Sequence, residues 1–454
     1  MNRYHVVLRL GNDDIAPITV SDPDALVREV PMLDAFGNLD FGFYEFTDSV
    51  RRHSLKPIEV ALDLVMLATA VFGADTRISR ALHSQDGWTR EIHLHVPVSD
   101  VASWNSQRGS LVRALNFLSG DKWNLTFRQR PGKLKSIVPV PKELNLGNHT
   151  SVSLLSGGLD SCIGAINLLT SGAKPFFVSH YSPSSSGYQQ AVLAELEKKF
   201  GAAAYTHLKA RNGFPREVIA DGGDEDSTRT RSFLFFALAV YVANGFGRPM
   251  QVLVPENGFI ALNVPLDPLR LGALSTRTAH PFYMARWNEF LAGLGLNVSL
   301  ENPYATKTKG QMVQECLDRP LLAKVAPVTM SCASPGKFRF NEEPWQHCGY
   351  CLPCLIRQSS LLVGLGAGKD TTLYHDAVDG ATLDSRKAEG EHVRAFQFAV
   401  KRLKARPSLA RMAIHKPGPL TDVVAQHSSL EQVYVNGMAE IEKLLANTKT
   451  RPGG

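Results

Sequence analysis

Residues 156 to 161 read Ser-Gly-Gly-Leu-Asp-Ser, a string whose groups could bind the phosphates of a nucleotide. Gly157 and Gly158 lack the Cβ atoms that would block close approach, so consecutive N–H groups can converge on phosphate oxygens. Two serine hydroxyls add donors, and a helix that starts here would add the positive end of its dipole. We therefore predict a polyanion site formed by Ser156, Gly157, Gly158, Leu159, Asp160 and Ser161.

Asp160 is the unusual member of this string, because a carboxylate repels phosphate unless a divalent cation lies between them. It is therefore a candidate Mg²⁺ ligand. The alternative is that Asp160 and Ser161 only cap the following helix, as these residue types often do. The β-like run before the string, the two glycines and the second serine favour the functional interpretation. The string lacks the Gly-Lys-Ser/Thr end of a Walker A loop.

Four of the six cysteines lie between positions 332 and 354, and three of them are separated by two-residue gaps. Four thiolates complete a tetrahedral zinc shell, and a closed shell without a water position is structural. Such bunching suits a metal site better than a disulfide framework spread along the chain. The sequence predicts a structural zinc site formed by Cys332, Cys348, Cys351 and Cys354.

Other interpretations of the cysteines stay open. An iron–sulfur cluster, or redox-active cysteines that transfer sulfur, could use the same residues. His347 could replace one thiol, although its place next to Cys348 favours a surface neighbour. Cys162 and Cys316 lie in helical contexts and are interpreted as small apolar packing residues.

Alternating strands and helices are expected from residue 151 onward. This pattern is typical of βαβ units, and it predicts a doubly wound parallel sheet over 150–330, with ligands at the carboxyl ends of the strands. The expected strands are 151–155, 176–180, 205–208, 251–254 and 297–300, and the expected helices are 161–169, 188–200, 231–244 and 281–294.

The regions on either side differ from this pattern. Residues 1–140 combine alternating runs with one apolar helix over 57–72, which predicts a separate N-terminal α+β domain. A polar, proline-punctuated linker is expected over 131–141. We assign 331–365 to a zinc-binding module and 366–454 to a helical C-terminal tail.

Composition sets the broad class of the 454-residue chain. Its 44% apolar and 20% charged residues are typical of a globular protein. No secretory signal and no membrane-spanning run is recognised, so we expect a cytoplasmic protein without a membrane partner. The formal net charge of +6 allows an anionic ligand but is too dispersed to argue for nucleic acid. The oligomeric state stays open.

The string at 156–161 resembles the PP-loop of N-type ATP pyrophosphatases, which cleave ATP between the α- and β-phosphates. Ser331-Cys332, Cys348-Gly-x-Cys351-x-x-Cys354 and Arg357 resemble the zinc module of the 7-cyano-7-deazaguanine synthase (QueC) family. Two helix starts, Arg229-Thr-Arg231-Ser-Phe-Leu and Thr308-Lys309-Gly-Gln-Met-Val, resemble further motifs of that family. The resemblance covers about residues 150–365.

This resemblance implies a HUP-like fold that uses ATP, Mg²⁺ and Zn²⁺. It implies adenylation of a deazapurine carboxylate such as 7-carboxy-7-deazaguanine, with release of pyrophosphate, followed by amide or nitrile formation with an amine. Arg231 and Lys309 stand at expected helix starts and are assigned to charge that develops on the phosphates. Polar residues of two loops could hold the base: Glu256, Asn257, Ser275, Thr276, Arg277, Thr278 and His280. His280 is also considered as a general base.

The 140 N-terminal residues have no counterpart in the short synthases. In this the chain is most similar to long QueC-like proteins of bacterial antiphage systems, the Qat and type IV CBASS groups, which implies a protein partner whose terminal amine is the acceptor. Three alternatives stay open: a housekeeping synthase for queuosine, a tRNA-modifying PP-loop enzyme, and a structural subunit that only binds ATP.

Overall fold

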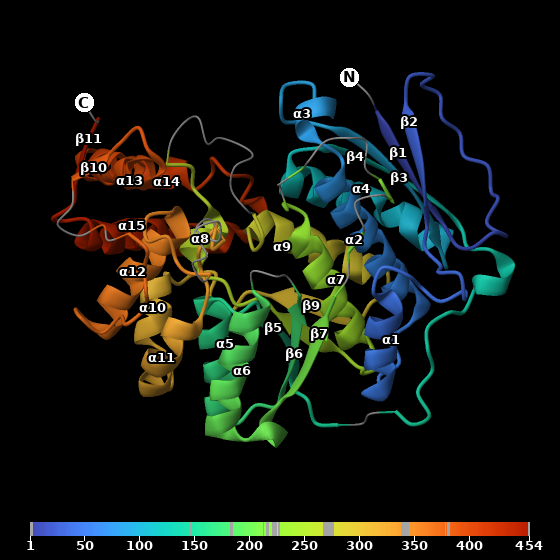
Figure 1. Ribbon diagram of the computed structural model, residues 1–454, viewed down its shortest axis with the longest axis horizontal. Helices are drawn as coiled ribbons and strands as arrows, with labels where there is room; N and C mark the ends of the chain where they lie inside the picture. The colour runs from blue at the N-terminus through green and yellow to red at the C-terminus, as the bar shows by residue number, and fades with distance from the viewer. Residues whose placement is uncertain are drawn as a thin grey trace.

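Two parallel β-sheets organise the chain. The computed structural model describes residues 3–144, 147–181, 185–211, 213–214, 218–219, 225, 228–266, 277–336, 345–376, 378 and 382–452. One sheet has four strands and belongs to the N-terminal third, and the other has five and belongs to the middle of the chain. Figure 1 shows the two sheets with helices between them and with a third, helical region at the C-terminal end.

The five-stranded sheet has the order β7-β6-β5-β8-β9 and is parallel throughout. Its central strands are buried on both faces, as expected of a parallel sheet with helices on both sides. Helices α7 and α9 cover one face, and α5 and α6 pack on the opposite face (Figure 1). The parallel sheet predicted over 150–330 is therefore confirmed. The strands are β5 (Ser151–Leu154), β6 (Pro175–His180), β7 (Thr206–Ala210), β8 (Met250–Leu253) and β9 (Val298–Glu301), and the helices are α5 (Leu159–Thr170), α6 (Ser186–Phe200), α7 (Arg231–Asn244), α8 (Gly258–Leu262) and α9 (Pro281–Gly293).

The N-terminal sheet corrects the prediction of an α+β domain. Its order is β2-β1-β3-β4 and every pair is parallel, so this region is α/β. The alternation of apolar residues identified the strands, but alternation does not encode whether neighbours run parallel or antiparallel. The elements are β1 (Tyr4–Arg9), β2 (Leu26–Pro31), α1 (Phe43–Arg52), α2 (Glu59–Arg77), α3 (Arg80–His83), β3 (Glu91–Val98), α4 (Val101–Ser119) and β4 (Lys122–Gln129).

The two sheets share one hydrophobic core, so the N-terminal region packs closely on the middle of the chain. Helix α2 packs against α7 and α4 packs against α9, which stacks the helices of one sheet on those of the other. Trp104 and Trp287 are fully buried in this common core. Helix α2 is buried on nearly all sides, which explains its apolar composition. Across the described parts of the chain, no helix is long and apolar enough to cross a membrane.

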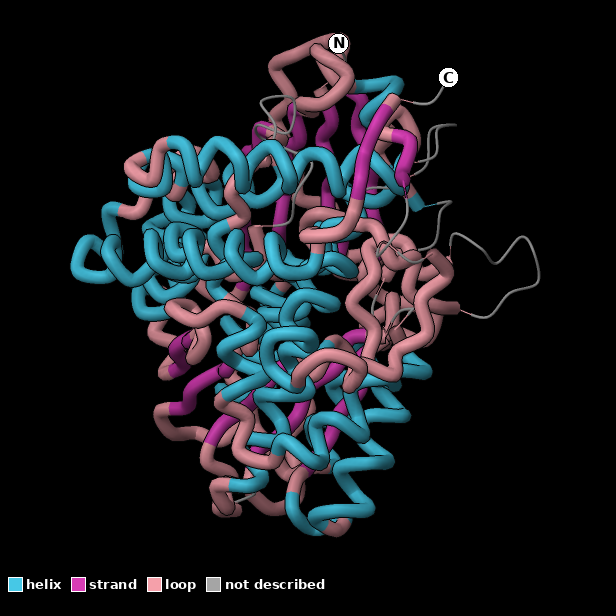
Figure 2. The backbone as a smooth tube through the Cα atoms, turned by 90° about the vertical axis from the view of Figure 1, so that its left-hand side faces the viewer, coloured by secondary structure: helices cyan, strands magenta, loops and turns pink. Residues whose placement is uncertain are grey.

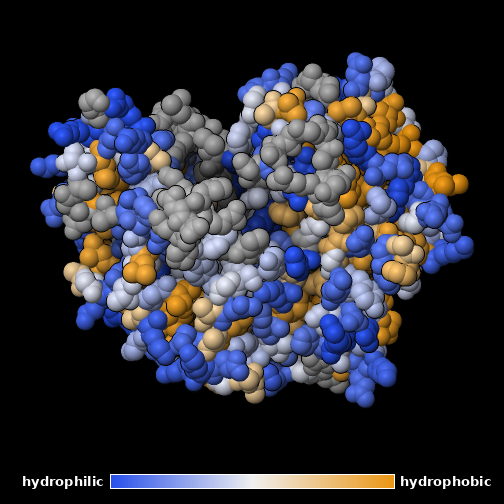
Figure 3. Space-filling view, viewed as in Figure 1, coloured by the Kyte–Doolittle hydropathy of each residue, from blue (hydrophilic) through white to orange (hydrophobic). Residues whose placement is uncertain are grey.

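The C-terminal region packs as a layer of its own. Helix α15 contacts α8, α12 and α13, and a second apolar core lies among them. Figure 2 shows these helices from their outer side. In Figure 3 a notch separates this lobe from the lobe of the N-terminal sheet. The expected helical tail over 366–454 is therefore an integral layer that also carries two short strands. The elements are α10 (Lys309–Gln314), α11 (Arg319–Val325), α12 (Leu352–Leu365), β10 (Thr382–Asp384), α13 (Ala388–Ala405), α14 (Leu409–Ala413), α15 (His427–Leu444) and β11 (Lys449–Arg451).

Candidate functional site

The Ser-Gly-Gly-Leu-Asp-Ser loop follows β5, the strand at which the order of the sheet reverses. From β5 the chain adds β6 and β7 on one side and then β8 and β9 on the other. The crevice beyond the carboxyl ends of β5 and β8 is therefore the topological switch point, where ligands of open α/β sheets bind. The loop at 155–158 and the loop at 254–257 both lie there, as predicted.

The geometry of the loop favours glycine at both positions, most strongly at Gly157. Gly157 has a φ of +84°, and a Cβ added to it would lie 3.0 Å from the backbone nitrogen of Gln189. A Cβ on Gly158 would lie 3.3 Å from the carbonyl oxygen of Met330. The N–H of Met330 in turn donates to the carbonyl of Gly157 at 2.8 Å. Larger residues would push these three segments apart.

The two serines of the loop hold it in shape. Their hydroxyl oxygens lie 3.1 Å apart, and the N–H of Gly158 donates to the Ser156 hydroxyl at 3.3 Å. The Ser161 hydroxyl donates to the carbonyl of Gly158 at 3.0 Å. Phosphate oxygens could replace these weak internal partners, so the hydroxyls suit an anion that approaches the start of α5.

Asp160 joins three segments that are distant in the sequence. Its Oδ2 accepts from the side-chain Nδ2 of Asn257 at 2.7 Å and from the Asn257 backbone N–H at 3.1 Å. Its Oδ1 lies 3.1 Å from Nζ of Lys309, whose side chain is only 4% exposed. Asp160 therefore stands at the meeting point of α5, α8 and α10. Gly158 is the N-cap of α5 and no side chain caps it, so the Asp160 carboxylate contacts other segments instead of serving as a helix cap.

Glu256 provides a second carboxyl group beside Asp160. Its backbone carbonyl accepts from Nδ2 of Asn302 at 2.8 Å, while Oε1 is buried and has no hydrogen-bond partner among the described residues. Burial raises the pKa of Glu256 to about 8, and the neighbouring charge of Asp160 adds to this rise, while Lys309 opposes it. Carboxylate oxygens are the ligands that Mg²⁺ prefers, so Asp160 and Glu256 could hold this ion together.

The raised pKa of Glu256 predicts a pH-dependent cost in stability. The folded chain holds this proton more tightly than the unfolded chain, so the free energy of unfolding falls as the pH rises from the ordinary pKa of 4.5 to about 8. Glu256→Gln removes this cost. In Mg²⁺-free buffer, urea unfolding is expected to show that the free energy of unfolding of the variant, relative to that of the wild type, increases over this pH range. Above this range the difference should stay constant. Glu315→Gln, which changes an exposed carboxyl, is the control. If the free energy of unfolding of Glu256→Gln ran parallel to that of the wild type across this pH range, the prediction would be contradicted.

Lys309 is positioned from the C-terminal layer. Thr308 caps α10 through a capping box with Gln311. The buried Glu440 of α15 accepts from the Thr308 hydroxyl and, at 3.2 Å, from the N–H of Gly310. Sequence reasoning did not identify Glu440, because nothing near it in the chain indicates that α15 reaches the start of α10.

Arg231 approaches the loop from the opposite side. It is the first residue of α7, and its guanidinium donates to the Ser185 hydroxyl at 3.5 Å. Gln189 connects this point to the loop, since its Nε2 donates to Ser185 Oγ at 3.3 Å and to the Ser156 carbonyl at 3.4 Å. Burial lowers the pKa of Arg231. Arg231 and Lys309 thus flank the loop from α7 and α10.

A buried ion-pair network anchors the residue before Arg231. Asp75 of α2 accepts from the N–H of Thr230 at 2.8 Å and from its hydroxyl at 3.0 Å. The same carboxylate pairs with Arg90 at 2.8 Å and with Arg80 at 3.1 Å, and all three side chains are buried. The N-terminal region therefore fixes the start of α7, a role for Asp75 that the sequence did not suggest.

Asp75→Asn is expected to lower the free energy of unfolding by about 3–5 kcal/mol, because it leaves buried guanidinium charge without full compensation. Asp13→Asn, which breaks the exposed pair with Lys133, should cost no more than about 1 kcal/mol. Urea unfolding of both variants measures the difference. An equal fall in the free energy of unfolding for both variants would show that the buried network stabilises the fold no more than the exposed pair does.

The second predicted substrate loop is described only in part, and its described residues have other partners than Asp160. Ser275 and Thr276 fall outside the described residues, and Thr278 is half-buried. Arg277 donates to the carbonyl of Phe117 at 2.7 Å and stacks on its ring. His280 is buried, and its Nδ1 accepts from the N–H of Phe282 at 3.2 Å as the cap of α9. These contacts join Arg277 and His280 to α4, while Glu256 and Asn257 join Asp160.

Helix capping also argues against His280 as a general base. Burial lowers its pKa to about 3, so the ring stays neutral and its Nδ1 is already used by the backbone. A base must be free to accept a proton from substrate.

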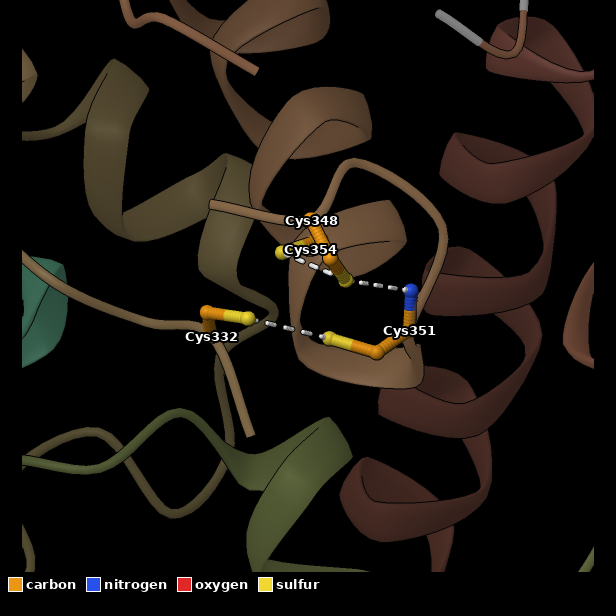
Figure 4. A group of neighbouring side chains, drawn as sticks. All are labelled: Cys332, Cys348, Cys351 and Cys354. Atoms are coloured by element: carbon orange, nitrogen blue, oxygen red, sulfur yellow. Dashed lines mark hydrogen bonds between the residues drawn. The ribbon is translucent and has the colours of Figure 1, made fainter. Parts of the chain in front are cut away.

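The four cysteines come together as predicted (Figure 4). Cys332 and Cys351 have Sγ atoms 3.9 Å apart, as do Cys348 and Cys354, and all four Sγ atoms lie within 4.8 Å of one another. A Zn–S bond of about 2.3 Å places the sulfurs of a tetrahedral site about 3.8 Å apart. The cluster could therefore hold a single metal ion such as zinc. A multi-iron cluster would hold its cysteines farther apart.

The cysteine cluster and the loop at 156–161 are neighbours. Met330, which donates to Gly157, lies two residues before Cys332. His347 is buried rather than on the surface, and its Nε2 accepts from the N–H of Ser331 at 3.1 Å, which explains its place beside the cluster without making it a ligand. The segment that carries Cys332 thus borders the loop on its other face.

No protein-family model matches the chain, and no curated protein is found to be similar to it. The function proposed below rests on the geometry of the loop, on the residues around it, and on the motifs that they form.

Proposed function

We propose that the chain is an ATP-dependent ligase that adenylates a deazaguanine-type carboxylate, such as 7-carboxy-7-deazaguanine, and releases pyrophosphate. One observation carries the proposal: Asp160 at the start of α5 meets Lys309 and Asn257 at the switch point of a parallel sheet, with a second carboxyl at Glu256. Cations and oxygen ligands around a glycine-rich loop suit the charges of ATP and Mg²⁺.

In the proposed reaction, the glycine and serine groups of the loop bind the β- and γ-phosphates. Bound Mg²⁺ would neutralise phosphate charge, with Asp160 and Glu256 as its protein ligands. A carboxylate oxygen of the substrate attacks the α-phosphorus, and the bond to the bridging oxygen of the β-phosphate breaks. Lys309 and Arg231 stabilise the charge of the leaving pyrophosphate. An amine then attacks the acyl carbon, AMP leaves, and an amide forms. The nitrile that the family resemblance implies would need ammonia as the amine and a second ATP, whose AMP would carry away the oxygen of the primary amide.

The acceptor amine is proposed to belong to a partner protein in an antiphage system, because the chain resembles long QueC-like proteins of such systems in its added N-terminal region. Ammonia, as in a housekeeping synthase, is the main alternative. A tRNA-modifying PP-loop enzyme is less well supported, because the geometry of the cysteines suits one closed metal site rather than a reactive pair. A subunit that only binds ATP remains the alternative from a different class.

The test incubates the purified full-length chain with ATP, Mg²⁺ and 7-carboxy-7-deazaguanine, with and without ammonium. We expect AMP and pyrophosphate to form only when the acid is present, and the mass of an amide or nitrile to appear when ammonium is added. Activated acid with no ammonium product would indicate a protein acceptor. Absence of pyrophosphate with every deazapurine acid tested would contradict the proposal, and ATP binding without cleavage would favour the structural subunit.

A further inference from the structure

Three histidines gather on one face of the N-terminal sheet. His5 on β1 lies directly opposite His93 on the neighbouring strand β3. His95 follows two residues after His93, and side chains two apart on a strand point to the same face. The other face of the same strands carries Tyr4, Ile92 and Leu94, which belong to the shared apolar core. The three imidazoles are therefore set apart from that core.

The imidazoles are close enough to share one ion. Their nitrogen atoms include a set, one per residue, in which all lie within 4.8 Å of one another. His5 Nδ1 and His95 Nε2 share a hydrogen bond of 2.9 Å, whose proton a metal ion would displace, and the rings of His93 and His95 are stacked with centroids 4.3 Å apart. His5 is 7% exposed and His95 is 3% exposed, while His93 is only half-buried, so water and metal ions reach the group from the side of His93.

We propose that His5, His93 and His95 form a second metal site, which binds a divalent transition-metal ion of the zinc type. Neutral imidazoles suit zinc and its neighbours in the first transition row. Three histidines with a fourth position left for water or a carboxylate make a recurrent zinc arrangement. The rigid parallel strands β1 and β3 hold the three rings at fixed separations.

The surroundings favour neutral rings with lone pairs available. Burial lowers the pKa of His93 to about 4 and that of His95 to about 3, so protons do not compete for these nitrogens near neutral pH. His93 Nε2 lies 2.7 Å from the hydroxyl of Thr126 on β4. Metal-bound histidines commonly use the second ring nitrogen in such a bond, which fixes the ring.

The charges near the three histidines are compatible with a bound cation. Arg9 is paired with Glu29, and Arg128 is paired with Asp14 at 2.5 Å, so the arginines nearest to His95 are neutralised by partners of their own. Asp22 adds negative charge close to His5. Arg3 and Arg108 add positive charge near His5 and His93, so the positive charge around the site is compensated in part.

The histidine site is independent of the cysteine cluster. The N-terminal sheet and the region of α12 lie at opposite sides of the molecule in Figure 1. A cation at the histidines can therefore be removed without touching the tetrathiolate site. The proposed histidine site also does not depend on the proposed ligase activity.

Metal stoichiometry tests the proposal. The tag-free full-length chain is saturated with Zn²⁺, freed of excess metal by gel filtration, and measured by atomic emission. The double variant His93→Gln/His95→Gln is expected to hold one fewer zinc ion per chain than the wild type. His83→Gln is the matched control, since His83 is a buried histidine of the same region that bonds to Tyr4 instead. Equal zinc content in the wild type and the double variant would overturn the proposal.

A measurement on the wild type guards against a variant that does not fold. Zinc X-ray absorption distinguishes imidazole nitrogen from thiolate sulfur. We expect both kinds of ligand in the zinc-saturated chain, with the multiple-scattering pattern of imidazole. A spectrum of sulfur ligands alone would overturn the site, whatever the fate of the variants.

Discussion

Asp160→Asn is expected to reduce the release of pyrophosphate from ATP by about a hundred- to a thousandfold. The amide keeps the size of the side chain and can still bond to Asn257, but it removes the negative charge that faces Lys309 at 3.1 Å. It also removes a carboxylate ligand for Mg²⁺ at the start of α5. Pyrophosphate release at saturating ATP and acid substrate is the measurement.

The matched control for this variant is Asp100→Asn. Asp100 also stands at a helix start, where it caps α4, but it is exposed and belongs to the N-terminal region. Asn caps helices nearly as well as Asp, so full activity is expected. The zinc content of Asp160→Asn should match the wild type, whereas thermal unfolding should show a loss of stability, because the buried Lys309 loses its charged partner. Undiminished pyrophosphate release in this variant would mean that Asp160 does not act on the phosphates.

Cys354→Ser should have the largest effect on stability. Cys354 is fully buried in the first turn of α12, and loss of one thiolate opens the tetrahedral shell. Because binding of a structural metal is coupled to folding, we expect loss of the ion and a fall of several kcal/mol in the free energy of unfolding. Helix α12 packs on α10, which carries Lys309, so ATP cleavage should fall as well. Zinc content and thermal unfolding measure the first two effects.

Cys316→Ser separates this effect from the simple loss of a buried thiol. Cys316 is buried in a different apolar cluster, and its thiol is not among the four that converge. Its zinc content should equal that of the wild type, with a smaller loss of stability. Retention of the metal by Cys354→Ser would show that the four thiols do not act as one site.

Local patterns predicted the parts of the site that lie on single short segments. The loop at 156–161, the helix starts at Arg231 and Lys309, and the cysteine spacing all depend on neighbours within a few residues. Such neighbours fix backbone conformation and helix ends, which is why these features could be read from the chain. The parallel five-stranded sheet followed from the same logic, because buried strands that alternate with helices leave few other arrangements.

Contacts between distant segments were missed. Asp75 meets Thr230, and Glu440 meets Thr308, across more than a hundred residues of chain. Neither acidic residue differs locally from an ordinary helix residue. The direction of the N-terminal strands was missed for a related reason, since it depends on how the connections pass over the sheet. The loop at 274–280 was assigned to substrate from its polar residues, and Arg277 at its described end donates to Phe117 of α4.

The burial of α2 on nearly all sides bears on how the chain folds during synthesis. The four-stranded sheet covers one side of this helix, and α7 covers another. Ribosomes extend chains by about 5–20 residues each second, so the 167 residues from the end of α2 at Arg77 to the end of α7 at Asn244 take about 10–30 s to appear. Throughout that interval the nascent N-terminal region exposes an apolar helix surface that awaits its partner, which makes it a natural client for chaperones.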